Sequence, residues 1–368
     1  MRATVSSEAF LPALRAATRV VPTRNLMPIL STILLQATDS HLQIAATDLE
    51  LTLQTEREAD VTEPGMIALP ARLLAEIAAD LPGERVTINN AGAVSKIASG
   101  AARFELTGMS PEDFPALPEP EADAILQLPG SALLALIKAT AYAVSTDDAR
   151  PFLTGVLFTI EDSVLRMAAT DGGRLALYSL TLPESTGTTF SGILPRRILT
   201  EAVRLVPANT DISLSWRENA LAIKAGPTRL TSRLIAGVFP TYQAVLDQAT
   251  KHVLTLTAPR QPLLRAIKRV SIASAQASHV VKFSVKDKVL MLSANAPSVG
   301  SASEPVAVTA DGDPLSIAFN ARFLIDALEA IPADTIRIGL TGAISPALMT
   351  PADAAEPLCV LAPVRTYD

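Results

Sequence analysis

Apolar and polar residues alternate along three stretches of the chain, and each stretch predicts antiparallel strands joined by short turns. The stretches cover residues 33–53, 156–179 and 281–296. A period of two places every second side chain on the same face of a strand. Polar turns interrupt the alternation at 39–40, 161–163 and 286–288, where Asp, Ser and Lys suit tight reversals.

A helical period replaces the alternation in six further segments. Three of them, residues 10–20, 133–144 and 263–273, each precede one of the alternating stretches. Residues 69–82, 194–207 and 319–332 align with one another without a gap, and each ends in proline. The chain therefore reads as helix, strands, helix, strands, three times over.

The three ungapped windows share a charge pattern. Arg72, Arg197 and Arg322 stand at the same position, 125 residues apart in both steps. Four residues after each arginine comes an acid, and these acids are Glu76, Glu201 and Asp326. A period of this length is that of a domain, so we predict an α+β protein of three repeated domains. The predicted limits are 1–122, 123–247 and 248–368, with an acidic, Pro-rich linker after Pro118.

A helical wheel separates apolar from basic residues in these windows. At ~100° per residue, Leu73, Leu74, Ile77, Ala78 and Leu81 fall in one stripe, and Arg72 lies nearly opposite its centre. Cations of the first helices also lie off the apolar face: Arg15, Arg19, Lys138, Arg265, Lys268 and Arg269. The helices are thus predicted to pack on sheets with one side and to present basic groups with the other.

Composition narrows the class of protein. The chain is 49% hydrophobic and 4% aromatic, so its cores are aliphatic, and its net charge of −6 by itself disfavours nucleic-acid binding. The repeated basic helix faces show that the charges can be segregated in space. A single cysteine, Cys359, excludes an internal disulfide, and no Cys/His cluster predicts a metal site. With no apolar run long enough to span a membrane, we expect a reduced, cytoplasmic protein without cofactors.

The basic faces carry no aromatic stacking platform and no phosphate-cradling glycine loop. Spaced cations of this kind contact phosphates without reading sequence, and such contacts let a protein move along a duplex. The alternative is that each arginine only pairs with the acid four residues on, in a solvated helix pair. Recurrence in all three windows favours a functional surface.

Five motifs run the length of the chain: Arg24-NLMPIL, Ala46-TDLE, Ala169-TDGGRL, Gly237-VFPTYQAVL and Val360-LAPVR. They resemble motifs of the bacterial DNA polymerase III β subunit, the β sliding clamp family. The resemblance implies three clamp domains, with helices lining a central channel and antiparallel sheets outside. It also implies a ring-shaped head-to-tail homodimer that encircles double-stranded DNA as a processivity factor in DNA replication, with no catalytic site of its own.

The resemblance carries residue roles to matching positions. For DNA, the basic-face and family positions together are Arg24, Arg72, Lys138, Arg150, Phe152, Arg196, Arg197, Lys268 and Arg322. The family's apolar pocket accepts short linear motifs of the polymerase III α subunit, the clamp loader, other polymerases and repair proteins. Its positions here are Leu153, Thr170, Gly172, Arg174, Leu175, Pro240, Val245, Val360, Pro363, Val364 and Arg365. Phe104 and Ile272 match the subunit interface.

The chain departs from the family pattern mainly at the pocket. Gly173 stands where the family usually has His, Ala244 where it commonly has Arg, and Ala362 and Val364 where it has Met. We expect a more open pocket, with Thr366-Tyr367-Asp368 adding an aromatic ring and a carboxylate nearby. At the interface, Ala273 replaces a larger aliphatic residue.

Three alternatives remain open from the sequence. The chain could be a divergent or second clamp with an altered response to partners or inhibitors, since the departures gather on the pocket. It could be a protein-binding scaffold that does not bind DNA. It could be an enzyme using Asp48 and Asp171, although these carboxylates lack convergent partners in the sequence.

Overall fold

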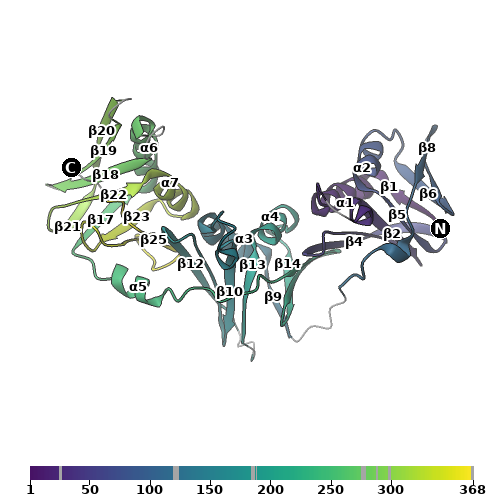
Figure 1. The fold of residues 1–368 in the computed structure, drawn as a ribbon, viewed down its shortest axis with the longest axis horizontal. Coiled ribbons are helices and arrows are strands. Elements are labelled where there is room, and N and C mark those ends of the chain that lie inside the picture. Colours follow the sequence, from purple (N-terminus) through teal and green to yellow (C-terminus); the bar gives the residue numbers. More distant parts are fainter. Residues whose placement is uncertain are drawn as a thin grey trace. The chain divides into compact units, whose positions relative to one another are not determined.

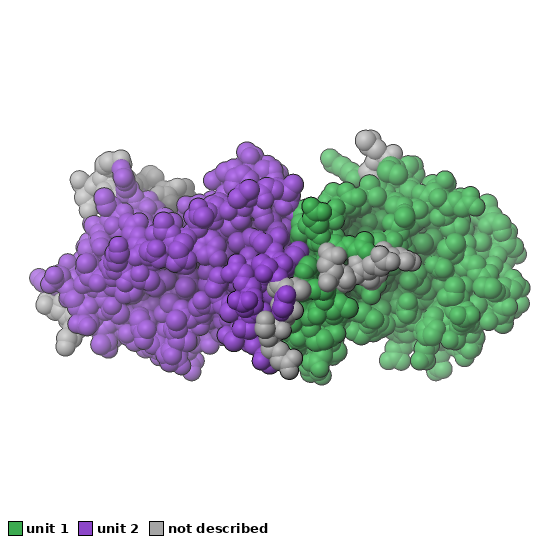
Figure 2. All heavy atoms as spheres, turned by 90° about the horizontal axis from the view of Figure 1, so that it is seen from below, with its two compact units in different colours: residues 1–132, 197–234 green, residues 133–196, 235–368 purple. Residues whose placement is uncertain are grey.

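The computed structural model describes residues 1–24, 27–118, 124–183, 187, 189–274, 279–286, 289–296 and 300–365. The chain divides into two compact units (Figures 1 and 2). Unit 1 comprises Met1–Ala132 and Arg197–Leu234, and unit 2 comprises Leu133–Arg196 and Ile235–Asp368. Among the described residues, no helix has the length and apolar character needed to cross a membrane.

Unit 1 is built on one antiparallel sheet. Its strands follow the order β8-β7-β6-β1-β4-β16-β15-β14-β9, and a branch of β3, β2 and β5, paired in that order, starts from β4. The strands are β1 (Arg2–Ser6), β2 (Thr32–Thr38), β3 (His41–Thr47), β4 (Leu51–Glu63), β5 (Gly65–Pro70), β6 (Arg85–Ala91), β7 (Val94–Ser99), β8 (Ala102–Thr107), β9 (Ala124–Pro129), β14 (Asp211–Arg217), β15 (Ala220–Ala225) and β16 (Thr228–Arg233).

Helices α1 (Ser7–Val20) and α2 (Ala71–Ala79) lie side by side in unit 1 (Figure 1). Phe10 and Leu14 of α1 and Leu74 of α2 are fully buried against the strands. Helix α4 (Arg196–Leu205) contributes its residues from Arg197 onward to the same unit. The short 3-10 helix η1 (Pro28–Ser31) lies between α1 and β2, and η2 (Pro111–Asp113) lies between β8 and β9.

Unit 2 contains two antiparallel sheets, with the orders β13-β10-β11-β12-β25-β24-β23-β17-β21 and β20-β19-β18-β22. The strands are β10 (Gly155–Glu161), β11 (Val164–Thr170), β12 (Arg174–Thr181), β13 (Phe190–Pro195), β17 (Leu254–Pro259), β18 (Val280–Lys286), β19 (Val289–Ala296), β20 (Gly300–Ala307), β21 (Thr309–Gly312), β22 (Leu315–Asn320), β23 (Thr335–Leu340), β24 (Ala347–Pro351) and β25 (Leu358–Leu361). Its helices are α3 (Gly130–Thr140, from Leu133 on), α5 (Gln243–Ala249), α6 (Arg260–Ser271), α7 (Ala321–Ala330), and the 3-10 helices η3 (Ala141–Ala143), η4 (Pro151–Leu153) and η5 (Ile272–Ser274).

The α+β class and the alternating strands predicted from the sequence are confirmed. Turns at Asp39 and Asp162 adopt positive φ angles of 48° and 53°, a conformation that aspartate tolerates better than most side chains. The third predicted turn, at 286–288, lies partly outside the described residues. All six predicted helical segments contain helix: α2, α4 and α7 are shorter than their windows, whereas α1, α3 and α6 each begin three residues before theirs.

The predicted apolar stripe of the second helix is wrong at two positions. Leu73 is 45% exposed, whereas Leu74, Ile77 and Ala78 are buried as expected. Leu73 lies at one margin of the stripe, ~70° from its centre at ~100° per residue, where cover depends on what packs beside the helix. Leu81 is only half-buried, because α2 ends at Ala79 and Leu81 no longer follows the helical period.

Both larger sheets continue across the domain limits predicted from the sequence. In unit 1, β4 pairs with β16, so Leu53 lies opposite Leu230. In unit 2, β12 pairs with β25, so Leu175 lies opposite Val360. The predicted central domain is therefore shared between the two units, with β9 and β14–β16 in unit 1 and β10–β13 in unit 2.

Candidate functional site

A cavity of about 360 Å³ opens in unit 2 beside the turn between β11 and β12. Strand β25, η4 and the segment leading into α5 supply the rest of its wall. Its lining residues are Arg150, Phe152, Leu153, Thr170, Gly172, Gly173, Arg174, Leu175, Pro240, Thr241, Tyr242, Val245, Pro346, Val360 and Ala362. A mostly apolar cavity with a few polar groups at one edge is typical of sites that accept a peptide or a small molecule.

Most of the pocket residues expected from the sequence line this one cavity. They are Leu153, Thr170, Gly172, Arg174, Leu175, Pro240, Val245 and Val360. Pro363, Val364 and Arg365 follow β25 and do not line it. The backbone of this terminal segment is held in place, because Ala362 donates to the Gly173 carbonyl at 2.9 Å and Val364 to the Ala318 carbonyl at 2.8 Å. The tail 366–368, expected near the pocket, lies outside the described residues.

Two residues expected at the DNA, Arg150 and Phe152, line the same cavity. Arg150 is half exposed and pairs with Asp147 at 3.0 Å. Their place beside Leu153 follows from η4, whose short turn carries Phe152 and Leu153 into the unit. The two residues thus lie where a pocket ligand would meet them.

Sequence reasoning missed Thr241, Tyr242 and Pro346 as lining residues. Thr241 and Tyr242 belong to the Gly237-VFPTYQAVL motif, so the motif itself was a usable signal. Pro346 precedes β24 and carries no motif, and only the pairing of β24 with β25 brings it to the cavity.

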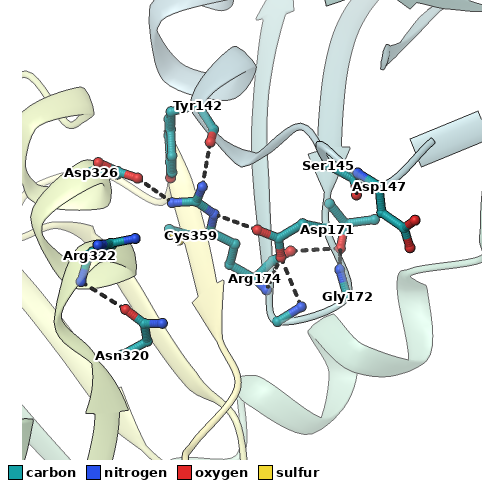
Figure 3. Close-up of polar contacts among 12 residues, drawn as sticks. Tyr142, Ser145, Asp147, Asp171, Gly172, Arg174, Asn320, Arg322, Asp326 and Cys359 are labelled. Atoms are coloured by element: carbon teal, nitrogen blue, oxygen red, sulfur yellow. Dashed lines mark hydrogen bonds and ion pairs between the residues drawn. The ribbon is translucent and has the colours of Figure 1, made fainter. Parts of the chain in front are cut away.

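Arg174 anchors the wall of the cavity (Figure 3). Its Nε donates to Asp171 at 3.0 Å, one Nη to Asp326 at 2.6 Å and the other Nη to the Tyr142 carbonyl at 2.7 Å. The guanidinium also lies 4.4 Å from the ring centre of Phe323 and 5.3 Å from that of Tyr142. With a side chain only 9% exposed, Arg174 is a charged group whose donors are used inside the protein.

Asp171 also organises the backbone of the turn. Its Oδ1 accepts from the amides of Gly173 and Arg174, at 2.9 and 3.0 Å. Asp48 in unit 1 plays the same part, since its Oδ1 accepts from Glu50 and Leu51, and Arg197 pairs with its other oxygen. The two carboxylates considered for catalysis are therefore engaged in turn and ion-pair contacts.

Cys359, on β25, is a free cysteine and is fully buried. Burial raises the pKa of its thiol to about 12, although a hydrogen bond with Tyr142 acts in the opposite direction. Burial likewise raises the pKa of Tyr142 well above its usual value. Both groups stay neutral at physiological pH, so neither supplies a nucleophile here.

Gly173, where the family usually has His, is explained by the neighbouring helix. A Cβ at this position would lie 2.7 Å from Cε2 of Phe323 on α7, too close for contact. Phe323 therefore occupies the space that a side chain at 173 would need, and it covers Arg174 instead. The two positions depend on each other.

Substitution Gly173→Ala is expected to displace Phe323 and to destabilise unit 2 by about 1–3 kcal/mol, because overpacking of a filled site is unfavourable. Thermal unfolding of the full chain measures the effect. In a Phe323→Leu background the loss should shrink, since the smaller side chain leaves room for the methyl group. Equal losses in both backgrounds would show that Phe323 does not limit the site.

The predicted DNA-facing cations differ in exposure and in whether they form ion pairs. Arg24, Arg72, Lys138 and Arg322 are exposed, and within the described residues their side chains enter no ion pair. Arg197 pairs with Asp48, and Lys268 pairs with Glu329. Arg196 is exposed at the first position of α4.

The two predicted interface residues are both exposed apolar side chains. Phe104 on β8 is 38% exposed and Ile272 in η5 is 71% exposed. Strand β8 ends the sheet of unit 1, and β20 ends the four-stranded sheet of unit 2. Glu304, on β20, pairs with Arg269 of α6. Among the described residues, no group of three or more acidic, His or Cys side chains could hold a metal.

The family comparisons match this arrangement along the chain. Models of the DNA polymerase III beta subunit match its N-terminal domain to residues 1–118, its central domain to 127–241 and its C-terminal domain to 245–365. These are the three similar domains of a replication clamp. The chain belongs to the DNA polymerase III β subunit family, that of the β sliding clamps.

Curated relatives and solved structures agree with this assignment. The β sliding clamp of Chlamydia pneumoniae is 31% identical over 95% of this chain and 94% of its own length, and that of Synechococcus elongatus is 31% identical over 96% of both. The crystal structure of the Bacillus subtilis clamp superposes with a TM-score of 0.96 at 28% identity, covering all of both chains. A Pseudomonas aeruginosa clamp bound to griselimycin superposes with a TM-score of 0.95 at 31% identity, again over both whole chains.

Proposed function

We propose that the protein is a sliding clamp of bacterial DNA replication. Two copies would close head to tail around double-stranded DNA, and the ring would hold the polymerase on its template without catalysing a reaction. The observation that carries this proposal is that sets of three strands pair with one another through their last strands. This pairing leaves two such last strands, β8 and β20, as edge strands. Within this proposal the three domains are residues 1–122, 123–247 and 248–368. The protein would act in the cytoplasm.

The strands form consecutive sets of three, and the last strand of one set pairs with the last strand of another. Strand β4 ends the set β2–β4 and pairs with β16, which ends β14–β16. Strand β12 ends β10–β12 and pairs with β25, which ends β23–β25. By the same rule β20, ending β18–β20, should pair with β8, ending β6–β8, and both are edge strands in this chain.

A second copy supplies the missing partner for both edges. Strand β20 of one copy would add to β8 of the other, and the reciprocal contact would close the ring. Phe104 on β8 and Ile272 beside the β20 end would be buried in this contact. Exposed strand edges are otherwise liable to uncontrolled pairing, so a specific partner also resolves that hazard.

For DNA, we propose non-specific contact with phosphates through exposed helical cations. Arg72, Lys138 and Arg322 support this best, because each is exposed on a helix and enters no ion pair within the described residues. Arg24, between α1 and η1, and Arg196, the first residue of α4, join them as exposed cations. Arg197 and Lys268 would contribute less, since nearby carboxylates already neutralise them.

The cavity beside Arg174 would accept short linear motifs from partner proteins. Buried apolar walls from Leu153, Leu175 and Val360 suit the aliphatic or aromatic anchors of such motifs. We include the polymerase III α subunit, the clamp loader, other polymerases and repair proteins as expected partners. Arg150 and Phe152 would meet the ligand at the rim rather than DNA alone.

A second candidate is a divergent clamp with an altered partner or inhibitor response. The position of Phe323 favours it, because Phe323 leaves no room for a side chain at Gly173, which lines the cavity. Affinity for a standard clamp-binding peptide separates the two candidates: ordinary micromolar binding would remove the reason for the divergent role.

Topological retention on DNA tests the clamp proposal. The protein is loaded by a bacterial clamp loader onto a nicked circular plasmid, and bound protein is measured before and after the plasmid is cut. A ring should stay bound in high salt on the circle and should be lost on linearisation. Loss in modest salt from the uncut circle would indicate simple electrostatic adhesion and would overturn the proposal.

A further inference from the structure

A second cavity, of about 340 Å³, lies in unit 1 over the strands β3, β4, β15 and β16. Its volume is at the lower end of the ~300–1,000 Å³ that is typical of ligand sites. It shares no residue with the cavity beside Arg174. Its lining residues are Gln43, Gln54, Glu56, Lys224, Gly226, Pro227 and Arg229. Because most of these side chains are polar or charged, the cavity suits a polar ligand.

Strand register places the polar side chains on one face of the sheet. Gln54 on β4 lies opposite Arg229 on β16, and Arg229 lies opposite Lys224 on β15. One position along, Leu53 and Leu230 face each other and are buried. Since successive side chains of a strand point to opposite faces, the row of Gln54, Arg229 and Lys224 lies on the face away from this core.

Two cations stand directly opposite each other in this row. Lys224 and Arg229 are paired across β15 and β16, and within the described residues neither enters an ion pair. Like charges in directly opposed positions of a sheet repel each other. An anion between the two side chains would relieve this repulsion, and the planar guanidinium of Arg229 suits a carboxylate.

Two buried polar atoms of the same row lack a hydrogen-bond partner among the described residues. They are Oε1 of Gln54, which accepts hydrogen bonds, and Nε of Arg229, which donates one. Buried polar groups are normally paired, so an unpaired acceptor opposite an unpaired donor indicates a place for a ligand that supplies both. A carboxylate with a neighbouring N–H group does this, because its oxygen accepts from Arg229 while the N–H donates to Gln54.

Glu56 and Gln43 extend the site along the strands. Glu56 follows Gln54 by two positions on β4, on the same face and about 7 Å further along the strand. Every second N–H of an extended peptide recurs at the same spacing, so a second N–H can donate to Glu56. Gln43 lies opposite Glu56 and carries an amide that can donate to a peptide carbonyl. The Glu56 carboxylate also repels a multiply charged anion such as phosphate.

We propose that this cavity binds the C-terminal end of an extended peptide. The terminal carboxylate lies between Arg229 and Lys224, the N–H of the last residue donates to Oε1 of Gln54, and the N–H two residues earlier donates to Glu56. The cavity thus recognises the backbone and the charge of a chain end, with little dependence on side chains. A partner protein could be held here without use of the cavity beside Arg174.

Isothermal titration calorimetry on the full-length protein tests the proposal with N-acetylated trialanine whose carboxylate is free. The same peptide closed as a C-terminal amide is the matched control ligand. The free carboxylate should improve affinity about tenfold or more, because its hydrogen bonds to the cations are charge-assisted. Equal affinity for the two peptides, or no saturable binding of the first, would overturn the proposal.

Acetate and inorganic phosphate serve as further probes in the same titration. Each should bind about tenfold or more weakly than the free-carboxylate peptide, since acetate has no N–H for Gln54 and phosphate meets the charge of Glu56. If either anion bound as tightly as the peptide, the cavity would be a general anion site and the assignment to a peptide end would be wrong.

Arg229→Gln is expected to weaken binding of the free-carboxylate peptide about tenfold or more, because it removes one of the two charges that hold the carboxylate. Arg233→Gln is the matched control. Arg233 is an exposed cation further along β16 that does not line the cavity. Its replacement should leave the affinity within about twofold of wild type. Unchanged binding by Arg229→Gln would place the peptide elsewhere and refute the proposal.

Gln54→Glu separates ligand binding from a purely structural role. The carboxylate introduced opposite Arg229 can accept from its Nε within the chain, so the variant should unfold at no lower temperature than wild type. The same carboxylate repels that of the ligand, and affinity for the peptide should fall about tenfold or more. Thermal unfolding and calorimetry measure the two effects. Wild-type affinity in this variant would show that the ligand carboxylate does not lie beside Gln54, and the proposal would fail.

Discussion

Replacing Arg174 with alanine is expected to destabilise unit 2 by about 3 kcal/mol or more, because it leaves Asp171, whose side chain is only 17% exposed, without its ion-pair partner. Asp171 and Asp326 would each lose an ion pair, and the carbonyl of Tyr142 would lose its donor. The rings of Phe323 and Tyr142 would also face an empty space. The cavity should lose its shape together with its stability, since Arg174 forms part of the wall.

Differential scanning calorimetry of the full chain measures this effect, since a chain of two units need not unfold in one step. Arg150→Ala is the matched control, because Arg150 lines the same cavity but its pair with Asp147 is half exposed. An exposed pair contributes about 0–1 kcal/mol, so the control should shift the transition little. Equal shifts for the two variants would show that the Arg174 network does not hold the unit together.

Val245→Asp is expected to weaken binding of a clamp-binding peptide about 100-fold, because ligand binding would bury a carboxylate against apolar groups. Val245 lines the cavity and is 40% exposed, so the fold itself should tolerate the change. Fluorescence anisotropy with a labelled peptide of a polymerase or clamp loader gives the affinity. Such a loss would place the ligand in this cavity.

Val238→Asp provides the control for the same substitution. Val238 is 87% exposed, seven residues earlier, and does not line the cavity. It should leave the affinity within about twofold of wild type, as expected for a surface change away from the ligand. If both variants, or neither, weakened binding, the peptide would bind elsewhere on the protein.

The pocket shows how far motifs can predict a site. Leu175, Pro240 and Val360 were identified from short motifs and Leu153 from the family resemblance, and the structure gathers all four around one cavity. Pro346 could not be identified, because its place depends on the pairing of β24 with β25. Pro363, Val364 and Arg365 share a motif with Val360, but the chain turns away from the cavity after Ala362.

The charged windows show the limit more sharply. Spacing alone suggested that each arginine pairs with the acid four residues on, since that pair is the one a helix can form by itself. In the structure, Arg197 pairs with Asp48, and Asp326 with Arg174. These partners lie about 150 residues apart, as their numbers show, and no local pattern encodes such a meeting.

The sequence by itself determined the strands, the helices, the threefold repeat and the motifs, because period, turn chemistry and spacing are local properties of the chain. Only the tertiary structure decided which strands join neighbouring sets, which carboxylate each arginine meets and which apolar helix residue stays exposed. Leu73, Ile198 and Phe323 share one place in the repeat and differ in burial, because cover comes from whatever packs against them. Packing between distant segments determines how far each of these side chains is buried, and residue spacing along the chain does not specify that packing.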